Sequence, residues 1–266
     1  MSGASLTVAT FNLRKDSFTD GLNRWAYRKP LVKEVIEENR IDVLGVQEVL
    51  PSMRRDLERE LKEYAIVGLG RKKDLSNEHS DILVNKGTAL LSFYTTFWLS
   101  KLPYAFGSKF MPSIFPRICT VAELYLKNSS QKIRVFNTHL DHLSGYVRQK
   151  EVSCILEYKQ RLQQEEPLPT ILMGDLNTKP MSRLMTRLRE FRLEGLGLKD
   201  VFAVCHGYND KTNTYHSFKG KQSGRHLDYI YASDEFLIED CFIDRSNEQG
   251  RYPSDHYPLV AKLALR

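Results

Sequence analysis

Strand-like and helical runs alternate along this chain, and that alternation constrains its fold more than any other feature. Residues 6–11 are β-branched and alternating, residues 41–46 form a buried-strand run, and Pro30 and Pro51 each open a helical pattern. The middle of the chain is rich in antiparallel-looking strands, which favours α+β layers over a simple parallel sheet. Further strands are predicted at 64–67, 89–97, 118–126, 133–138, 170–174, 227–232, 236–242 and 259–263, with helices at about 146–163 and from Pro180.

Composition sets the class of protein. Among the 266 residues, 41% are hydrophobic and 27% charged, which is typical of a soluble globular protein and excludes wholesale disorder. A chain of this length buries a core without disulfides. No repeat or linker divides it, so we expect a single domain over residues 1–266.

Cysteine usage and targeting signals predict a cytoplasmic protein. The four cysteines lie far apart without a CxxC pair, which favours a reducing compartment. The first residues show no signal peptide, and the longest uncharged stretch, Gly87–Ser100, is too short to span a bilayer. A net charge of +6 weakly favours anionic partners such as phosphates or nucleic acid.

Polar residues repeatedly stand where apolar strand runs end. A carboxylate is costly to bury unless it is paired or binds a metal, so this many polar strand ends are unlike ordinary turns. Strand ends at one edge of a layered sheet share a pocket, and we therefore expect these groups to converge. They are Asn12, Gln47-Glu48, Asn137 to His142, Gly174 to Asn177, His226 to Asp228 and Ser254 to His256.

This combination of residue types suits metal-assisted transfer of a phosphoryl group to water. Carboxylate and amide oxygens are the ligands that Mg²⁺ prefers, and Mn²⁺ is the alternative cation. A histidine held by an aspartate moves a proton or stabilises charge near neutral pH.

Two other chemistries fit less well. Asn137 to His142 is similar to the HxHxDH zinc signature of metallo-β-lactamase-like hydrolases, but Asn137 replaces its first histidine and removes a ligand. That interpretation also leaves Glu48 and Asp175 without a role. GxSxG, P-loop and dinucleotide motifs are absent from the sequence.

The ordered set of motifs resembles the endonuclease/exonuclease/phosphatase superfamily over nearly the whole chain, and within it the bacterial single-domain subgroup. The resemblance implies a four-layer DNase I-like α/β sandwich, in which helices flank two central mixed sheets. It departs from the subgroup at Leu83-Val84-Asn85, where an aromatic-Tyr-Arg run is usual. The segments that match the superfamily are Thr10–Arg14, Val46–Glu48, Asn137–His142, Gly174–Asn177, Asp228–Ile230 and Ser254–His256. Those that match the subgroup are Trp25 with Arg28, Gly68–Arg71, Thr96–Ser100 and Pro116–Cys119.

The resemblance also implies a role for each site residue. Glu48 corresponds to the principal Mg²⁺ or Mn²⁺ ligand, with Asn12 beside it and Asp255 near the metal. The residues implied in catalysis are His256, held by Asp228; Asp175 and Asn177, which orient water and phosphate; and His139, a second phosphate-binding histidine. Arg117 would contact the substrate phosphate, and Glu78 would pair with His139.

These features predict a divalent-metal-dependent phosphoesterase that cleaves a phosphodiester or phosphomonoester by in-line attack of water, with nuclease-like activity favoured. Sphingomyelinase-like or inositol-phosphatase-like activity is the alternative, and a degenerate, non-catalytic binding module is the alternative of another class. The expected partner is a phosphate-ester substrate, with nucleic acid as one candidate. Nothing indicates an obligatory protein partner, and Met111–Phe115 is a weak candidate for membrane contact.

Overall fold

The computed structural model describes residues 5–129, 131–191, 198–207 and 212–266. Residues 1–4, part of the segment in which no signal peptide is expected, lie outside these ranges. Within them, no helix is both long enough and apolar enough to cross a membrane.

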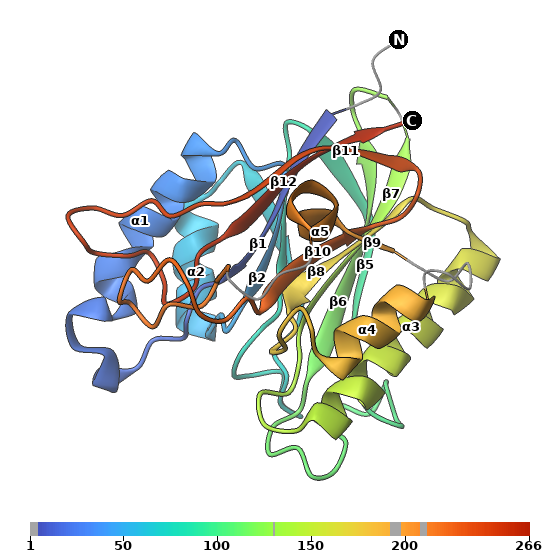
Figure 1. The fold of residues 1–266 in the computed structure, drawn as a ribbon, viewed down its shortest axis with the longest axis horizontal. Coiled ribbons are helices and arrows are strands. Elements are labelled where there is room, and N and C mark those ends of the chain that lie inside the picture. The colour runs from blue at the N-terminus through green and yellow to red at the C-terminus, as the bar shows by residue number, and fades with distance from the viewer. Residues whose placement is uncertain (1–4, 130, 192–197, 208–211) are drawn as a thin grey trace.

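Two six-stranded mixed sheets form the centre of the molecule (Figure 1). The first has the order β11-β12-β1-β2-β4-β3, and the second β5-β6-β7-β8-β10-β9. The first consists of β1 (Ser5–Asn12), β2 (Val43–Gln47), β3 (Tyr64–Val67), β4 (Ile82–Asn85), β11 (Phe236–Ile243) and β12 (Leu259–Leu265). The second consists of β5 (Ala89–Trp98), β6 (Ile118–Leu126), β7 (Lys132–His139), β8 (Thr170–Asp175), β9 (Lys199–Asp200) and β10 (Asp228–Ala232).

The two sheets pack face to face on an apolar layer. Val8 and Val43 of the first sheet meet Val135 and Ile171 of the second, all of them fully buried. Successive residues of a strand point to opposite faces, so Ala9, next to Val8, faces the other side. The central strands of each sheet therefore bury both of their faces, as their continuous apolar runs require, whereas the outermost strands β5 and β11 keep exposed side chains.

Helices cover the outer face of each sheet (Figure 1). Helices α1 (Trp25–Glu38) and α2 (Pro51–Glu60) cover the first sheet, and α3 (Gly145–Glu165) and α4 (Arg183–Phe191) cover the second. A short 3-10 helix, η1 (Phe18–Asn23), precedes α1, and α5 (Val201–His206) packs into the layer between the sheets. The four-layer sandwich of two mixed sheets flanked by helices is thus confirmed.

Two predicted helix starts differ from the structure, and one strand was not predicted. Pro30 lies inside α1 rather than at its start, because the helix begins at Trp25, whose indole packs in the core beneath it. The helix expected from Pro180 begins at Arg183. Strand β4 was not predicted, because its four residues carry no alternation; pairing with β2 and β3 defines it.

Candidate active site

Strand direction places the polar strand ends at one edge of both sheets. Strands β1 and β2 run parallel with Asn12 opposite Gln47, and β7 and β8 run parallel with His139 opposite Asp175. Strand β10 is antiparallel to β8, so its first residue, Asp228, lies opposite Asp175. Strand β12 is antiparallel to β1, which brings the preceding loop to the same edge. The convergence expected from the sequence is present.

Asn12 connects the two sheets at this edge. Its side-chain amide donates to Glu48 Oε1 (3.2 Å) and to Asp175 Oδ2 (3.1 Å). Its amide oxygen accepts from the backbone N–H of Arg14 at 2.9 Å. The orientation of Asn12 is therefore fixed by three hydrogen bonds, and its nitrogen faces the two carboxylates.

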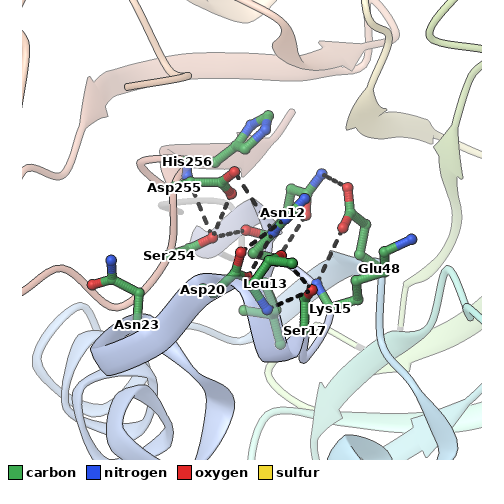
Figure 2. A network of polar contacts seen from close by, with 12 residues as sticks. Asn12, Leu13, Lys15, Ser17, Asp20, Asn23, Glu48, Ser254, Asp255 and His256 are labelled. Carbon is green, nitrogen blue, oxygen red and sulfur yellow. Dashed lines mark hydrogen bonds and ion pairs between the residues drawn. The ribbon is translucent and has the colours of Figure 1, made fainter. Parts of the chain in front are cut away.

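The loop before β12 lies against the end of β1, as Figure 2 shows. Ser254 Oγ donates to the backbone oxygen of Asn12 at 2.6 Å, and the backbone N–H of His256 donates to Ser254 Oγ at 3.3 Å. Asp255 lies 4.0 Å from Arg14 Nε, and burial raises its pKa. The hydrogen bonds of Ser254 to Asn12 and His256 set the position of His256 relative to the first sheet.

His256 lies between two carboxylates of the second sheet. Its Nδ1 is 2.8 Å from Asp228 Oδ2, and its Nε2 is 3.8 Å from Asp175 Oδ2. Burial opposes the charged imidazolium, but the charge and hydrogen bond of Asp228 raise the pKa of His256 well above its usual value. His256 is therefore a cation at neutral pH with Asp228 as its partner.

Asp175 has a pKa suited to proton transfer near neutrality. Burial and the nearby charge of Asp228 raise the pKa of Asp175 to about 7, although His256 and the hydrogen bonds from Asn12 and Asn177 act in the opposite direction. The backbone N–H of Asn177 donates to Asp175 Oδ1 at 2.8 Å, and the Asn177 side chain donates to the backbone oxygen of Leu140 at 3.0 Å.

His139 has the opposite electrostatic character from His256. Its Nε2 lies 3.7 Å from Asp175 Oδ2. Burial, followed by the charges of Arg117 and Arg71, lowers the pKa of His139 well below its usual value. The site therefore presents one charged and one neutral imidazole.

Two site residues have strained backbones. Glu48 has a φ of 60° and Asn177 a φ of 49°, in the left-handed region that favours glycine. Such strain persists where the surrounding structure imposes it, and it is concentrated at functional sites. Here Glu48 directly follows the last residue of β2, and Asn177 lies two residues after the last residue of β8.

The donor set fits a divalent cation. Asp175, Asp228 and His256 place side-chain oxygen and nitrogen atoms within 4.8 Å of one another, and because His256 is protonated, the two aspartates are the members of this group that can coordinate a cation. Asp228 Oδ1 is buried and has no hydrogen-bond partner, as expected of an oxygen reserved for a cation or water. Hydrogen bonds from Asn12 and the Lys15 N–H, with the charge of His256, outweigh burial and lower the pKa of Glu48, which stays an anionic oxygen donor.

A basic cluster adjoins this acidic centre. Glu78 accepts from Arg71 Nη2 (2.8 Å) and from Lys15 Nζ (3.2 Å), so it pairs with these cations rather than with His139. Arg117 Nη2 lies 3.0 Å from Nδ1 of the exposed His142. Arg71 belongs to Gly68–Arg71, a segment that resembles the bacterial subgroup, but the sequence assigned no role to it or to Lys15. Only the fold brings these two cations together here.

This architecture and its polar edge define the class of DNase I-like α/β sandwiches. The chain belongs to the endonuclease/exonuclease/phosphatase family, whose model matches residues 9–256. It is accordingly a hydrolase of phosphate esters, in a family whose members generally use a divalent metal.

Several solved structures are similar to this chain over nearly its whole length. An endonuclease/exonuclease/phosphatase family protein from Bacteroides thetaiotaomicron has 26% identity, a TM-score of 0.90 and 99% coverage of both chains. The corresponding protein from Bacteroides vulgatus has 27% identity and a TM-score of 0.90, covering 99% of this chain and all of its own. A mannosyl-6-phosphatase of Bacteroides thetaiotaomicron VPI-5482 has 26% identity and a TM-score of 0.89, covering 98% of this chain and all of its own. Comparison with curated protein sequences finds no match.

Proposed function

We propose that this protein is a divalent-metal-dependent phosphoesterase that cleaves its substrate by in-line attack of water. The observation that carries the proposal is the His256 imidazole, held between Asp228 (2.8 Å) and Asp175 (3.8 Å) at the edge where both sheets end. Such a cationic imidazole donates to a phosphate oxygen on which negative charge develops.

Each neighbouring residue then has a distinct task. Asp175, with a pKa of about 7, accepts the proton of the attacking water, and Asn177 fixes the carboxylate through its backbone N–H. His139 donates from its neutral ring to another phosphate oxygen. Asp228 keeps the His256 ring oriented and charged.

Glu48 is the proposed principal metal ligand, with Asn12 holding it in place and Asp255 nearby. When bound, a divalent cation neutralises phosphate oxygens and lowers the barrier to attack. Arg117 and Glu78 complete the substrate side, Glu78 by positioning its cationic neighbours.

Nucleic acid is a second candidate substrate, favoured by a groove away from the motifs. A cavity of about 950 Å³ lies between α3 and residues 100–111, and it is lined by Tyr104, Tyr146, Lys101 and Lys150 among others. Aromatic faces with basic side chains are what single-stranded nucleic acid requires. The sequence does not reveal this combination of aromatic and basic residues, because residues 100–111 and α3, which form the two walls of the cavity, lie about 40 residues apart in the chain. The membrane-contact hypothesis rests on Met111–Phe115, in which Met111 is 73% and Ile114 57% exposed, and stays a prediction.

The test is hydrolysis of p-nitrophenyl phosphate and bis(p-nitrophenyl) phosphate with Mg²⁺, with Mn²⁺ and with chelator. We expect turnover with metal and none with chelator. Absence of metal-dependent turnover on both compounds and on a panel of DNA, RNA, sphingomyelin, inositol phosphates and sugar phosphates would favour a binding module instead.

A further inference from the structure

A small cavity beside His139 contains two arginines. It has a volume of about 10 Å³, the space of a single water molecule, and both Arg71 and Arg117 line it together with Glu78. The side chains of both arginines are more than nine-tenths buried. Burying one guanidinium is costly, and burying two beside each other requires compensating negative charge.

The protein supplies only part of that compensation. Glu78 is shared between Arg71 and Lys15, so one carboxylate faces two cations. Among the described residues, Arg117 has no ion pair within 4.0 Å, and its buried Nε has no hydrogen-bond partner. The cluster of Arg71, Arg117, Lys15 and Glu78 therefore carries an excess of positive charge and an unused donor.

The guanidinium of Arg71 is held in place before any ligand arrives. Its Nε donates to Asn77 Oδ1 at 2.9 Å, and its Cζ lies 4.7 Å from the centre of the Phe115 ring. The indole N–H of Trp98 donates to the backbone oxygen of Arg71 at 2.7 Å. A donor fixed in this way loses little conformational entropy when it binds an anion.

The position of the cluster determines which phosphate it serves. His139 lies 3.7 Å from Asp175 and also lines the cavity of the two arginines, so the arginine cluster adjoins the proposed reaction site through His139. A phosphodiester has two non-bridging oxygens and one negative charge. A phosphomonoester has a third terminal oxygen and a second charge, which a planar guanidinium can bind.

We propose that Arg71 and Arg117 form a receptor for the terminal oxygens of a phosphate dianion, so that the enzyme prefers phosphomonoesters to phosphodiesters. This inference rests on the proposed function, because it names the substrate class of the same site. It assigns Arg71 and Arg117 to specificity: they select the substrate by its charge.

The first experiment compares kcat/KM for p-nitrophenyl phosphate and bis(p-nitrophenyl) phosphate in the wild type and in Arg117→Gln, Arg71→Gln and Arg117→Lys. Loss of a hydrogen bond to a charged group predicts that the monoester-to-diester ratio falls about 10- to 100-fold in each Gln variant. Arg117→Lys should recover part of the ratio. Arg59→Gln, on the exposed outer surface, is the control and should leave the ratio unchanged.

The second experiment needs no catalysis. In the presence of chelator, inorganic phosphate should raise the melting temperature of the wild type, whereas dimethyl phosphate, a monoanion, should not. Arg117→Gln should abolish the phosphate shift. A wild type that hydrolyses neither these two compounds nor any substrate of the panel overturns the proposed function. A wild type that hydrolyses the diester at least as well, or a ratio and phosphate shift unchanged in both Gln variants, overturns the arginine receptor alone.

Discussion

The layer between the two sheets and the edge of those same sheets follow opposite rules. In the layer, Val8, Val135 and Ile171 are fully buried and apolar. At the edge, Asp175, Asp228 and His256 are almost as deeply buried but ionisable. The same strands therefore contribute stability along their length and chemistry at their ends.

The edge is unfavourable for folding by itself. Burial raises the pKa of Asp175 to about 7, and Glu48 and Asn177 adopt positive φ. Both features cost free energy that the apolar layer must offset. Substitutions in the two regions should consequently separate activity from stability, and the following predictions test that separation from the largest effect to the smallest.

Replacing His256 with Ala should reduce kcat/KM by about 10²- to 10⁴-fold, because the cation that donates to the phosphate is lost. Steady-state kinetics with metal, together with circular dichroism to verify folding, measures this effect. His206→Ala, which removes an imidazole on α5, should retain wild-type kinetics. A folded His256→Ala enzyme with unchanged kinetics would contradict the mechanism.

Replacing Ile171 with Ala should destabilise the protein by about 2–5 kcal/mol, because it opens a cavity in the layer between the sheets. Urea unfolding measures the loss, and kcat of the remaining folded enzyme should not change. Leu237→Ala, at a 51% exposed position on β11, should stay within about 0.5 kcal/mol of the wild type. A large fall in kcat for Ile171→Ala would show that the two regions are coupled.

Replacing Glu48 with Gln should abolish stabilisation by Mn²⁺. At 100 times its dissociation constant, a ligand stabilises a protein by about 2.7 kcal/mol, which a melting curve with and without chelator detects. Glu63→Gln, at an exposed position, should keep the metal-induced shift. An equal shift in both variants would place the metal elsewhere.

Replacing Glu151 with Gln should change how stability depends on pH. Glu151 lies on α3 and accepts the backbone N–H of Asp141 at 2.8 Å, and burial raises its pKa to about 7. Because folding raises the pKa of Glu151, the stability that its protonated carboxyl contributes is fully present below about pH 4.3, the usual glutamate pKa. That stability is lost as the pH rises through 7. The Gln variant lacks that loss.

Relative to the wild type, Glu151→Gln should therefore gain on the order of 1–3 kcal/mol between pH 5 and pH 8. Urea unfolding at both pH values measures the gain, and Glu157→Gln on the same helix serves as the control. A stability difference between Glu151→Gln and the wild type that is the same at both pH values would contradict the assignment.

Sequence reasoning succeeded where the signal is local. Asn12, Glu48 and Asp175 stand where an apolar run stops, so the composition of the strand and the identity of its end lie next to each other in the chain. The resemblance supplied their order and the two-sheet architecture. Their physical convergence follows from strand direction, which the two parallel pairs fix.

Features that depend on distant packing were not predictable. Arg71 reaches the site because Gly70 pairs with His79, which brings Arg71 to the cavity that it shares with Arg117 and His139, and the sequence assigned it no role. Asn12 looks like a metal ligand in the sequence, but in the structure its amide nitrogen joins Glu48 and Asp175. Pro30 violates a helix-start rule because α1 gains core contacts at Trp25.

The contact between Ser254 and the backbone of Asn12 joins segments 242 residues apart. On the ribosome, Asn12, Glu48 and Asp175 emerge long before His256, and β12 then inserts between β1 and β11. Nascent chains that end before Ser254 lack His256 and cannot form its pair with Asp228. Under the proposed function, hydrolysis would therefore require the last strand to be made and inserted, so activity would report the fraction of chains that have completed folding.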